Sequence, residues 1–487
     1  MKINFKFLIY LPIILLFLPS FSFYIPGLKV FEFYFVSLYI ALIFMFIQNY
    51  SSTINRIRNI ALKTPLVYYL LFLLFIIINS IILSIFGTTT LAKTFTAVLF
   101  KFILGILPSI FYFICLIPRY ISLKNFIQLF LKLLWISLIL GIVAYLGRWF
   151  DISIINNLFD FFANSRHISA AISSYNPDAA LYFEYGKRLT GLHAEPGYLG
   201  QFLYLFLPFI YSFSVPSLNL FTNKYLNIVC KNTLISLTWI NIILTKSPIT
   251  LILSLFISIL YYRKSIINFV RKSYLLIAIL LISIYLIFIN IDFSSTYIGR
   301  ILKVIQCLKS YELFVIAEPS LATRISSFIN EFCIFLQHPI TGVGFENLGN
   351  YVYTQLLRSP VPLTEEIIFR NIDAINRFNS AHLNKGFIYT ILAENGIIAG
   401  IILMYSYLKT FSVILKSNNF YKKFEFNYLL LKSLKYSLLC ILILFVYDLY
   451  LVNKFYNLLL SLSFIVIYTK RICLNKNKKS MRCLYEK

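Results

Sequence analysis

An all-α polytopic integral membrane protein, with about 12 transmembrane helices and two long extracytoplasmic loops, is the fold class that this sequence predicts. Of its 487 residues, 60% are hydrophobic and only 13% are charged, whereas soluble domains average roughly 25% charged residues. Apolar runs of about 18 residues recur along the whole length, and each is long enough to cross the hydrocarbon core of a bilayer. Because no segment is long and polar enough for an independent soluble domain, residues 1–487 are expected to form a single membrane domain.

Hydropathy divides the chain into a series of expected spans. They are residues 7–23, 31–48, 66–86, 96–117, 126–147, 197–214, 233–246, 248–262, 273–291, 385–408, 433–452 and 455–470. The first resembles the start of a signal peptide, but no small-residue cleavage site follows, so we expect an uncleaved helix. The seventh and eighth are only about 14 to 15 residues each and meet at Lys246 and Pro248. Such short segments either line a site or form a tight hairpin whose lysine reaches water, and both interpretations stay open.

The formal net charge of +26 is explained by membrane topology. With a cytoplasmic N-terminus, Lys and Arg collect in the segments on the cytoplasmic side, where the acids are Glu425 and Glu486. Positive charge on that side orients membrane proteins. Both termini, including the basic tail 471–487, are therefore expected in the cytoplasm, and nucleic acid is not expected as a partner.

Two expected loops are much longer than the rest, residues 148–196 and 292–384, and both lie on the extracytoplasmic face. Polar groups and irregular backbone are tolerated where water reaches them, so we expect the functional chemistry on this face. Within the second loop an amphipathic helix is expected near residues 321–338, ended by Pro339. This helix either lies on the membrane rim or packs on the bundle, or does both.

The apolar residues of this helix recur at helical spacing, and two charged residues, Arg324 and Glu331, lie two turns apart on another face. The apolar set is Ile325, Phe328, Ile329, Phe332 and Leu336. The seven cysteines of the chain are scattered, with no spacing that is typical of metal ligands. We therefore expect no metal site.

Three motifs follow one another on the extracytoplasmic face. They read RLTGLHAEPGYLG from residue 188, RISSFINEFCIFLQHPITGVGFENLGNY from residue 324, and SAHLNKGFIYTILAENGIIAGIIL from residue 380. This ordered set resembles the O-antigen polymerase and O-antigen ligase superfamily of polytopic membrane glycosyltransferases, over roughly residues 180 to 410. The chain departs from the family where one residue separates His382 from Asn384, and where Lys246-Ser247 stands in place of a Ser-Arg pair near the end of the seventh span.

The resemblance implies a donor sugar linked to polyprenyl pyrophosphate and an acceptor hydroxyl that attacks its anomeric carbon. Cations are needed for the pyrophosphate leaving group, and arginine binds phosphate oxygens in a bidentate fork. Arg188 and Arg324 match family positions for this role, and Lys246 and His338 are further candidates for binding the pyrophosphate or glycan. Each arginine is alternatively paired with a loop acid or a lipid headgroup. No metal and no cofactor are implied.

A base is needed for the proton of the acceptor hydroxyl. His382 is the first candidate, because an imidazole transfers protons near neutral pH, and the alternative is that it caps the tenth span. Glu195 is the rival base, although it can instead orient Arg188. Glu394, inside the tenth span, is expected to fix helix packing, with Gly396 and its neighbour Gly400 allowing close approach.

The resemblance favours a polysaccharide polymerase of the O-antigen or capsule type, which joins lipid-linked repeat units outside the cytoplasmic membrane. The first alternative is an O-antigen ligase, which transfers glycan to lipid A–core or another acceptor. The second is a flippase or transporter of lipid-linked oligosaccharides, which would place charges along a path inside the bundle. The implied partners are the polyprenyl-pyrophosphate-linked oligosaccharide, the lipid bilayer, a chain-length regulator and a flippase. High Ile, Asn, Lys and Phe content is typical of an AT-rich bacterial genome, so a bacterial cytoplasmic (inner) membrane is the expected location.

Overall fold

A computed structural model describes most of the expected spans and parts of the loops. The described residues are 6–18, 22–23, 31–86, 105–117, 119–163, 189, 196–214, 220–272, 319–345, 347–348, 351, 387–421, 425–447 and 454–475. They are helical apart from turns and one short antiparallel pair of strands, in which β1 (Ser22–Phe23) lies opposite β2 (Phe31–Glu32).

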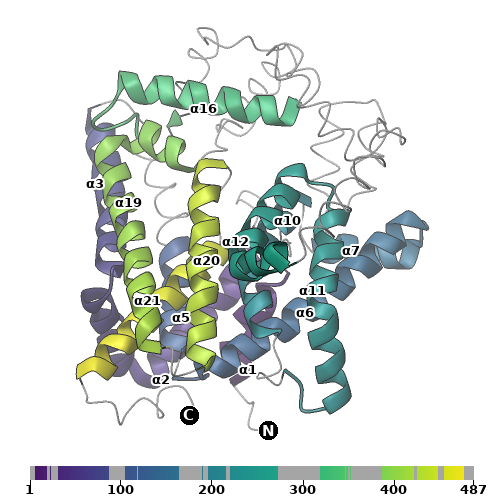
Figure 1. The fold of residues 1–487 in the computed structure, drawn as a ribbon. Coiled ribbons are helices and arrows are strands. Elements are labelled where there is room, and N and C mark those ends of the chain that lie inside the picture. The colour runs from purple at the N-terminus through teal and green to yellow at the C-terminus, as the bar shows by residue number, and fades with distance from the viewer. Residues whose placement is uncertain are drawn as a thin grey trace.

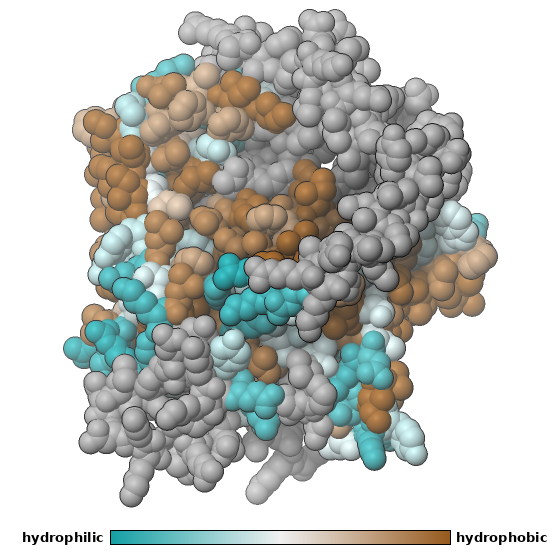
Figure 2. Space-filling view, in the orientation of Figure 1, coloured by the Kyte–Doolittle hydropathy of each residue, from teal (hydrophilic) through white to brown (hydrophobic). Residues whose placement is uncertain are grey.

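Eight helices in the described residues are long and apolar enough to cross a membrane. They are α2 (Phe33–Lys63), α3 (Leu66–Ile85), α6 (Leu123–Trp149), α11 (Lys224–Leu244), α12 (Pro248–Lys272), α19 (Phe387–Tyr421), α20 (Glu425–Tyr447) and α21 (Lys454–Asn475). The protein is therefore a helical, multi-pass membrane protein, and the lipid bilayer is its partner. Figure 2 shows hydrophobic residues over much of the face in view.

The remaining described helices are shorter or less apolar. They are α1 (Lys6–Leu15), α5 (Leu107–Leu116), α7 (Ser153–Ala163), α10 (Pro196–Phe213) and α16 (Pro319–Gln337). Helices α1, α5 and α10 fall on the expected first, fourth and sixth spans. The expected ninth span, residues 273–291, lies outside the described residues.

Helix starts in this chain follow local chemistry. Helices α10, α12 and α16 begin with a proline, whose fixed φ suits the first helical position. The side chain of Ser122 accepts a hydrogen bond of 3.1 Å from the N–H of Asn125 at the start of α6. The side chain of Asn223 likewise accepts from two backbone N–H groups at the start of α11.

The seventh and eighth spans are longer than their apolar segments indicate. Helix α11 has 21 residues and begins at Lys224, whereas α12 has 25 residues and runs to Lys272. Mixed charged and apolar residues extend α11 at its start and α12 at its finish. Charged side chains are unfavourable in lipid but do not prevent helical backbone once they reach water. Each helix is therefore long enough to cross a membrane, and the two are joined by a tight turn at Lys246, so both helices are longer than the segments expected from hydropathy.

Helices α10 and α20 lie at the centre of the bundle and pack on each other. Pro208 inside α10 has no N–H for the carbonyl of Tyr204, one turn earlier. The side chain of Cys440 in α20 donates to this carbonyl at 3.6 Å, and Ser437 donates to the neighbouring Leu205 carbonyl at 2.7 Å. The proline is thus tolerated because side chains of the adjacent helix replace the lost backbone donor.

The two ends of the bundle differ in character (Figure 1). The last turns of α21 lie at one end, which we name the basic end because exposed lysines and arginines gather there. They include Lys63, Lys224, Lys409, Lys416 and Arg471. At the opposite, distal end, α16 lies across the ends of the long helices rather than alongside them.

Candidate functional site

The turn of residues 338–345 follows α16 directly at the distal end. The N–H of His338 still bonds the carbonyl of Ile334, but Pro339 has no N–H with which to continue the helix. Gly342 then donates its N–H to the carbonyl of His338 at 3.0 Å. Gly342 and Gly344 have φ values of 66° and 95°, which favour glycine. The motif HPITGVG therefore forms a tight turn with backbone groups free to meet a second element.

Helix α19 is interrupted where this turn meets it. Gly396 has φ 75° and ψ −177°, so the helical hydrogen-bond pattern breaks at this residue. Three backbone hydrogen bonds to the turn replace it. They run from Val343 to Ala393 at 2.9 Å, from Gly344 to Glu394 at 2.7 Å, and from Ile397 to Pro339 at 2.9 Å. We name the turn of residues 338–345 together with the Gly396 kink the turn–kink junction.

Two glycines make this contact possible. A Cβ atom on Gly396 would lie 2.0 Å from the carbonyl oxygen of Ile340, and one on Gly342 would lie 2.3 Å from the carbonyl carbon of Glu394. Sequence analysis attributed Gly396 and Gly400 to close packing of helices. Gly396 instead receives the backbone of the turn, whereas the nearest atoms to Gly400 belong to Leu392 of the same helix.

Helix α3 holds the turn from the other side. The side chain of Asn79 donates to the carbonyl of Thr341 at 2.7 Å, and the hydroxyl of Ser80 accepts from the N–H of Phe345 at 3.4 Å. A small apolar cluster packs beneath these bonds. It consists of Ile334, Val343, Leu348 and Ala393. The turn is therefore fixed between α3 and α19.

Two buried carboxyl groups lie beside the junction, Glu331 of α16 and Glu394 of α19, and each is almost fully inaccessible to solvent. The hydroxyl of Thr390 donates to Glu331 Oε2 at 3.0 Å. Burial raises the pKa of the Glu331 carboxyl well above its usual range; the Thr390 hydrogen bond lowers it in part and the negative charge of Glu394 raises it further. A protonated Glu331 is the form that this environment favours.

Three buried polar atoms beside the turn–kink junction have no hydrogen-bond partner in the described part of the chain. They are Glu331 Oε1 and both side-chain polar atoms of the fully buried Asn395. A buried polar atom without a partner costs about 1–3 kcal/mol, so such atoms are rare in proteins.

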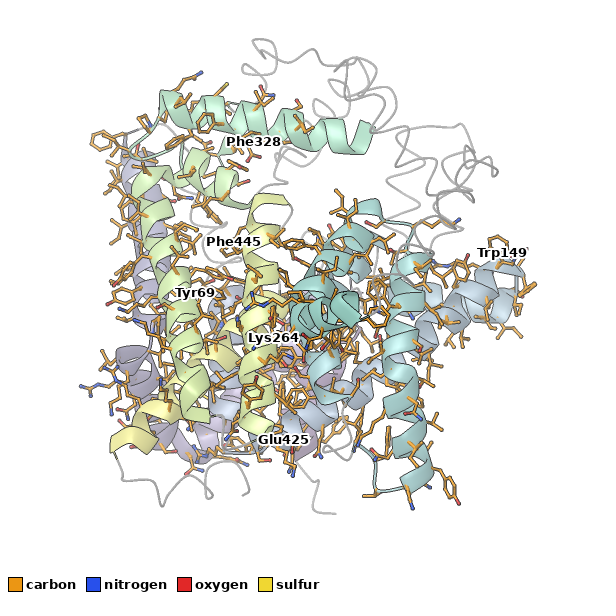
Figure 3. The ribbon with its side chains drawn as sticks, in the orientation of Figure 1. Tyr69, Trp149, Lys264, Phe328, Glu425 and Phe445 are labelled. Carbon is orange, nitrogen blue, oxygen red and sulfur yellow. The ribbon has the colours of Figure 1, made fainter. Side chains whose placement is uncertain are left out.

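Helix α16 presents its polar side to the bundle. Its buried residues include Ser326, Asn330 and Glu331, whereas Phe328, Phe332 and Leu336 on the apolar stripe are 37%, 40% and 59% exposed. Phe328, labelled in Figure 3, also contacts the ring of Tyr389 in α19 at 4.0 Å between centroids. Polar groups thus fasten α16 to α19, and most of the stripe faces outward, as expected for a helix at a membrane surface.

The first motif is represented by few described residues. Leu189, directly after Arg188 in the sequence, donates its N–H to the carbonyl of Leu244 at 2.9 Å. Lys246 stands two residues beyond Leu244, is exposed, and has φ 48° in the turn between α11 and α12. Gly200 of α10 lies against Thr250 of α12. Residues near both ends of the motif, Leu189 and Gly200, therefore contact the segments that flank the Lys246 turn.

The candidate residues are described to different extents. Arg188, Glu195 and His382 lie outside the described residues. Arg324 belongs to α16, but its side chain lies outside the described part. His338 is half-buried, and its ring meets the ring of Tyr351 edge-on at 5.4 Å.

Sequence analysis missed Asn79 and Ser80, which hold the turn, and Thr390, which bonds Glu331 beside it. The signal available for the first two was a polar Asn-Ser pair inside the apolar run FIIINSIILS of α3. In the described ranges no three His, Cys, Asp or Glu side chains are grouped so that they could bind a metal ion.

Comparison with known proteins does not assign the chain to a family. No protein-family model matches the sequence, and no curated protein matches it either.

Proposed function

We propose that the protein is a polysaccharide polymerase, which joins oligosaccharide repeat units carried on polyprenyl pyrophosphate at the outer face of a bacterial cytoplasmic membrane. It belongs, on this proposal, with the O-antigen polymerases and ligases that its three motifs resemble. The proposal includes about twelve spans, cytoplasmic termini, and an active site at the distal end. A chain-length regulator and a flippase are the protein partners it implies.

The observation that carries the proposal is the turn–kink junction. The second and third motifs are separate in sequence, yet their glycine-containing segments bond to each other through Val343, Gly344 and Ile397. Close backbone contact of this kind explains why glycines occur at those places in both motifs. A shared structural role for two motifs is what a common site at the distal end requires.

A second observation concerns the first motif. Leu189 bonds to the carbonyl of Leu244, and this places the backbone next to Arg188 beside the turn that bears Lys246. This contact supports a proposal in which Arg188 and Lys246 act on the same substrate group. Cations supplied by separate segments suit a leaving group that carries two or three negative charges.

The proposed reaction needs no cofactor. The acceptor hydroxyl forms a C–O bond to the anomeric carbon of the donor while the C–O bond to the polyprenyl pyrophosphate breaks. The pyrophosphate leaves with the bonding electron pair, and Arg188, Arg324, Lys246 and His338 are proposed to stabilise its charge. The hydroxyl proton passes to His382, or to Glu195 as the alternative base.

Helix α16 accounts for how an amphiphilic substrate reaches such a site. Its outward stripe, which includes Phe332 and Leu336, suits the apolar part of the membrane surface, while its polar side adjoins the junction. A substrate with its polyprenyl tail in lipid and its pyrophosphate at the interface would meet Arg324 on this helix. The sugars would then project away from the membrane.

The proposal is tested by the length of surface glycan on a gel, in a deletion strain that produces wild type or a single variant. The variants are Arg188→Ala, Arg324→Ala and His382→Ala, and their levels in membranes are matched by immunoblot. We expect each to lose the ladder of long chains and to leave a single-repeat band. Lys224→Ala is the control, because this exposed lysine lies at the basic end.

The same gel separates the alternatives. If the protein is a ligase, its inactive variants would accumulate long polymer on the lipid carrier and none on the final acceptor. If it is a flippase, its inactive variants would accumulate single repeats on the cytoplasmic side, where an added glycosidase cannot cleave them. Unchanged ladders from all three variants would contradict the site that we propose.

A further inference from the structure

A second group of cations lies far from the proposed site, where α12 packs against α20 nearer the basic end. Lys432 and Lys435 are three residues apart on α20, so they share a face of that helix. Arg263 of α12 is close enough for its charge to repel that of Lys435, and Lys435 in turn repels Lys432. We name these three residues the α12–α20 basic cluster.

Aromatic side chains hold this cluster in place. The Nζ atom of Lys432 lies 3.7 Å from the centre of the Tyr261 ring, and the Nζ atom of Lys435 lies 5.2 Å from that of Tyr436. The hydroxyl of Tyr436 donates to the carbonyl of Leu260 at 3.1 Å, which ties α20 to α12. The two lysines are therefore positioned between helices and do not simply extend into water.

No carboxylate balances these charges in the part of the chain that the structure describes. Among the described residues, the charges that act on Lys432 and Lys435 are those of Lys435 and Arg263. Like charges at close range repel each other, and an anion bound between the three would offset this repulsion. The cluster therefore has the charge that an anionic ligand would neutralise.

The position of the lysines argues against a purely topogenic role. Charges that orient a membrane protein stand in loops or at helix ends, whereas Lys432 and Lys435 are half-buried within the apolar span Glu425–Phe445. Seven and ten residues from the start of α20, they lie about 10 and 15 Å along the helix axis. Figure 2 shows hydrophilic atoms grouped at mid-height of the face in view, where Figure 3 labels Lys264 beside α20.

We propose that Arg263, Lys432 and Lys435 bind the phosphate headgroup of an anionic phospholipid from the leaflet at the basic end. Basic pockets between helices on the cytoplasmic side recognise such headgroups. Arginine at the rim suits the phosphate oxygens, and the surrounding exposed apolar residues of α12 suit the acyl chains. Residues Ile259 and Phe256 are among them. This inference does not depend on the polymerase assignment.

The test uses the full-length protein in nanodiscs made with phosphatidylcholine alone or with added phosphatidylglycerol of the same acyl chains. The apparent melting temperature and the number of retained lipids, counted by native mass spectrometry, are both measured. We expect phosphatidylglycerol to raise the melting temperature of the wild type and to be retained. The triple variant Arg263→Gln, Lys432→Gln, Lys435→Gln should bind it on the order of 100-fold more weakly.

Matched variants make the test specific. Lys224→Gln, Lys409→Gln and Lys416→Gln together remove the same charge from exposed positions of the basic end and should retain the wild-type response. The pair Lys432→Arg, Lys435→Arg keeps the charge and should retain lipid as well. If the triple variant fails to fold, the single change Lys435→Gln replaces it and should reduce retention in the same direction.

Three outcomes would overturn the proposal. The first is an equal loss of lipid binding in the triple variant and in the charge-matched control, which would indicate a diffuse surface effect. The second is unchanged binding in the triple variant. The third is an equal stabilisation by inorganic phosphate or pyrophosphate in phosphatidylcholine nanodiscs, which would assign the cluster to a soluble anion.

Discussion

Thr390 of α19, which is half-buried, donates a hydrogen bond of 3.0 Å to the fully buried carboxyl group of Glu331 in α16. This bond fastens the helix at the distal end to the span beneath it, six residues before the Gly396 kink. Because the bond uses only Oε2, the second oxygen of Glu331 is left without a partner in the described part of the chain. The stability of the folded protein is therefore expected to depend on the protonation of this carboxyl group.

The pH dependence of stability should fall in a definite window. In the unfolded chain Glu331 titrates near the usual value of 4.5, whereas burial and the charge of Glu394 raise its pKa in the folded protein. Below the unfolded value both states hold the proton. As the pH rises above it, the unfolded state releases its proton first, so the stability of the folded state declines up to the folded pKa. Glu331→Gln cannot ionise and should lose this decline.

The measurement is the apparent melting temperature in detergent across that range of pH. Glu425→Gln is the control, because Glu425 is exposed in the first turn of α20 at the basic end, and its curve should follow the wild type. The glutamine variant should gain stability relative to wild type as the pH rises. Parallel curves for wild type and Glu331→Gln would contradict the buried-acid interpretation.

The glycines of the turn–kink junction should not tolerate even a methyl group. Gly396→Ala places its Cβ 2.0 Å from the carbonyl oxygen of Ile340 and also forces a side chain into positive φ. The backbone conformation alone costs about 1–2 kcal/mol, and the clash adds to this cost. Gly197→Ala is a matched control, since a Cβ there has no neighbour within 4 Å. We expect a lower melting temperature and loss of polymer for Gly396→Ala, and an unchanged melting temperature for the control; equal melting temperatures of the two variants would contradict the junction.

The elements that the sequence predicted are those whose signal is local. Apolar runs predicted the long spans, because a membrane helix must satisfy its own backbone and expose apolar side chains. The ends of α11 and α12 were not predictable in this way, since Lys224 to Lys231 and Arg263 to Lys272 mix charged with apolar residues, and mean hydropathy does not distinguish such a helix from a loop. The parts of these two helices beyond the apolar segments form because their residues have adequate helix propensity in water.

The parts of the candidate site that depend on contacts between distant segments could not be predicted. The spacing of Phe328, Phe332 and Leu336 predicted an amphipathic helix, but not that its polar side would face the bundle. Glu331 was assigned to a face shared with Arg324, and its partner Thr390 lies on another helix. Likewise, Gly396 reads as a packing glycine until the backbone of Ile340 is seen against it. Pairing of this kind is information that only the folded chain contains.

Lys246 allows charge and conformation to be separated in a single position. Its φ of 48° is a region in which asparagine is tolerated far better than most residues, so Lys246→Asn removes the charge without adding strain. Since a hydrogen bond to a charged group contributes about 1.5–3 kcal/mol, loss of a pyrophosphate contact should reduce polymerisation roughly 10- to 100-fold. The melting temperature should not fall.

Two variants serve as controls. Lys246→Arg keeps the charge and should retain most activity, whereas Lys224→Asn at the other end of α11 should have no effect. Full polymer length from Lys246→Asn, measured at matched protein levels, would show that this lysine serves only the turn between α11 and α12 and would remove it from the proposed site.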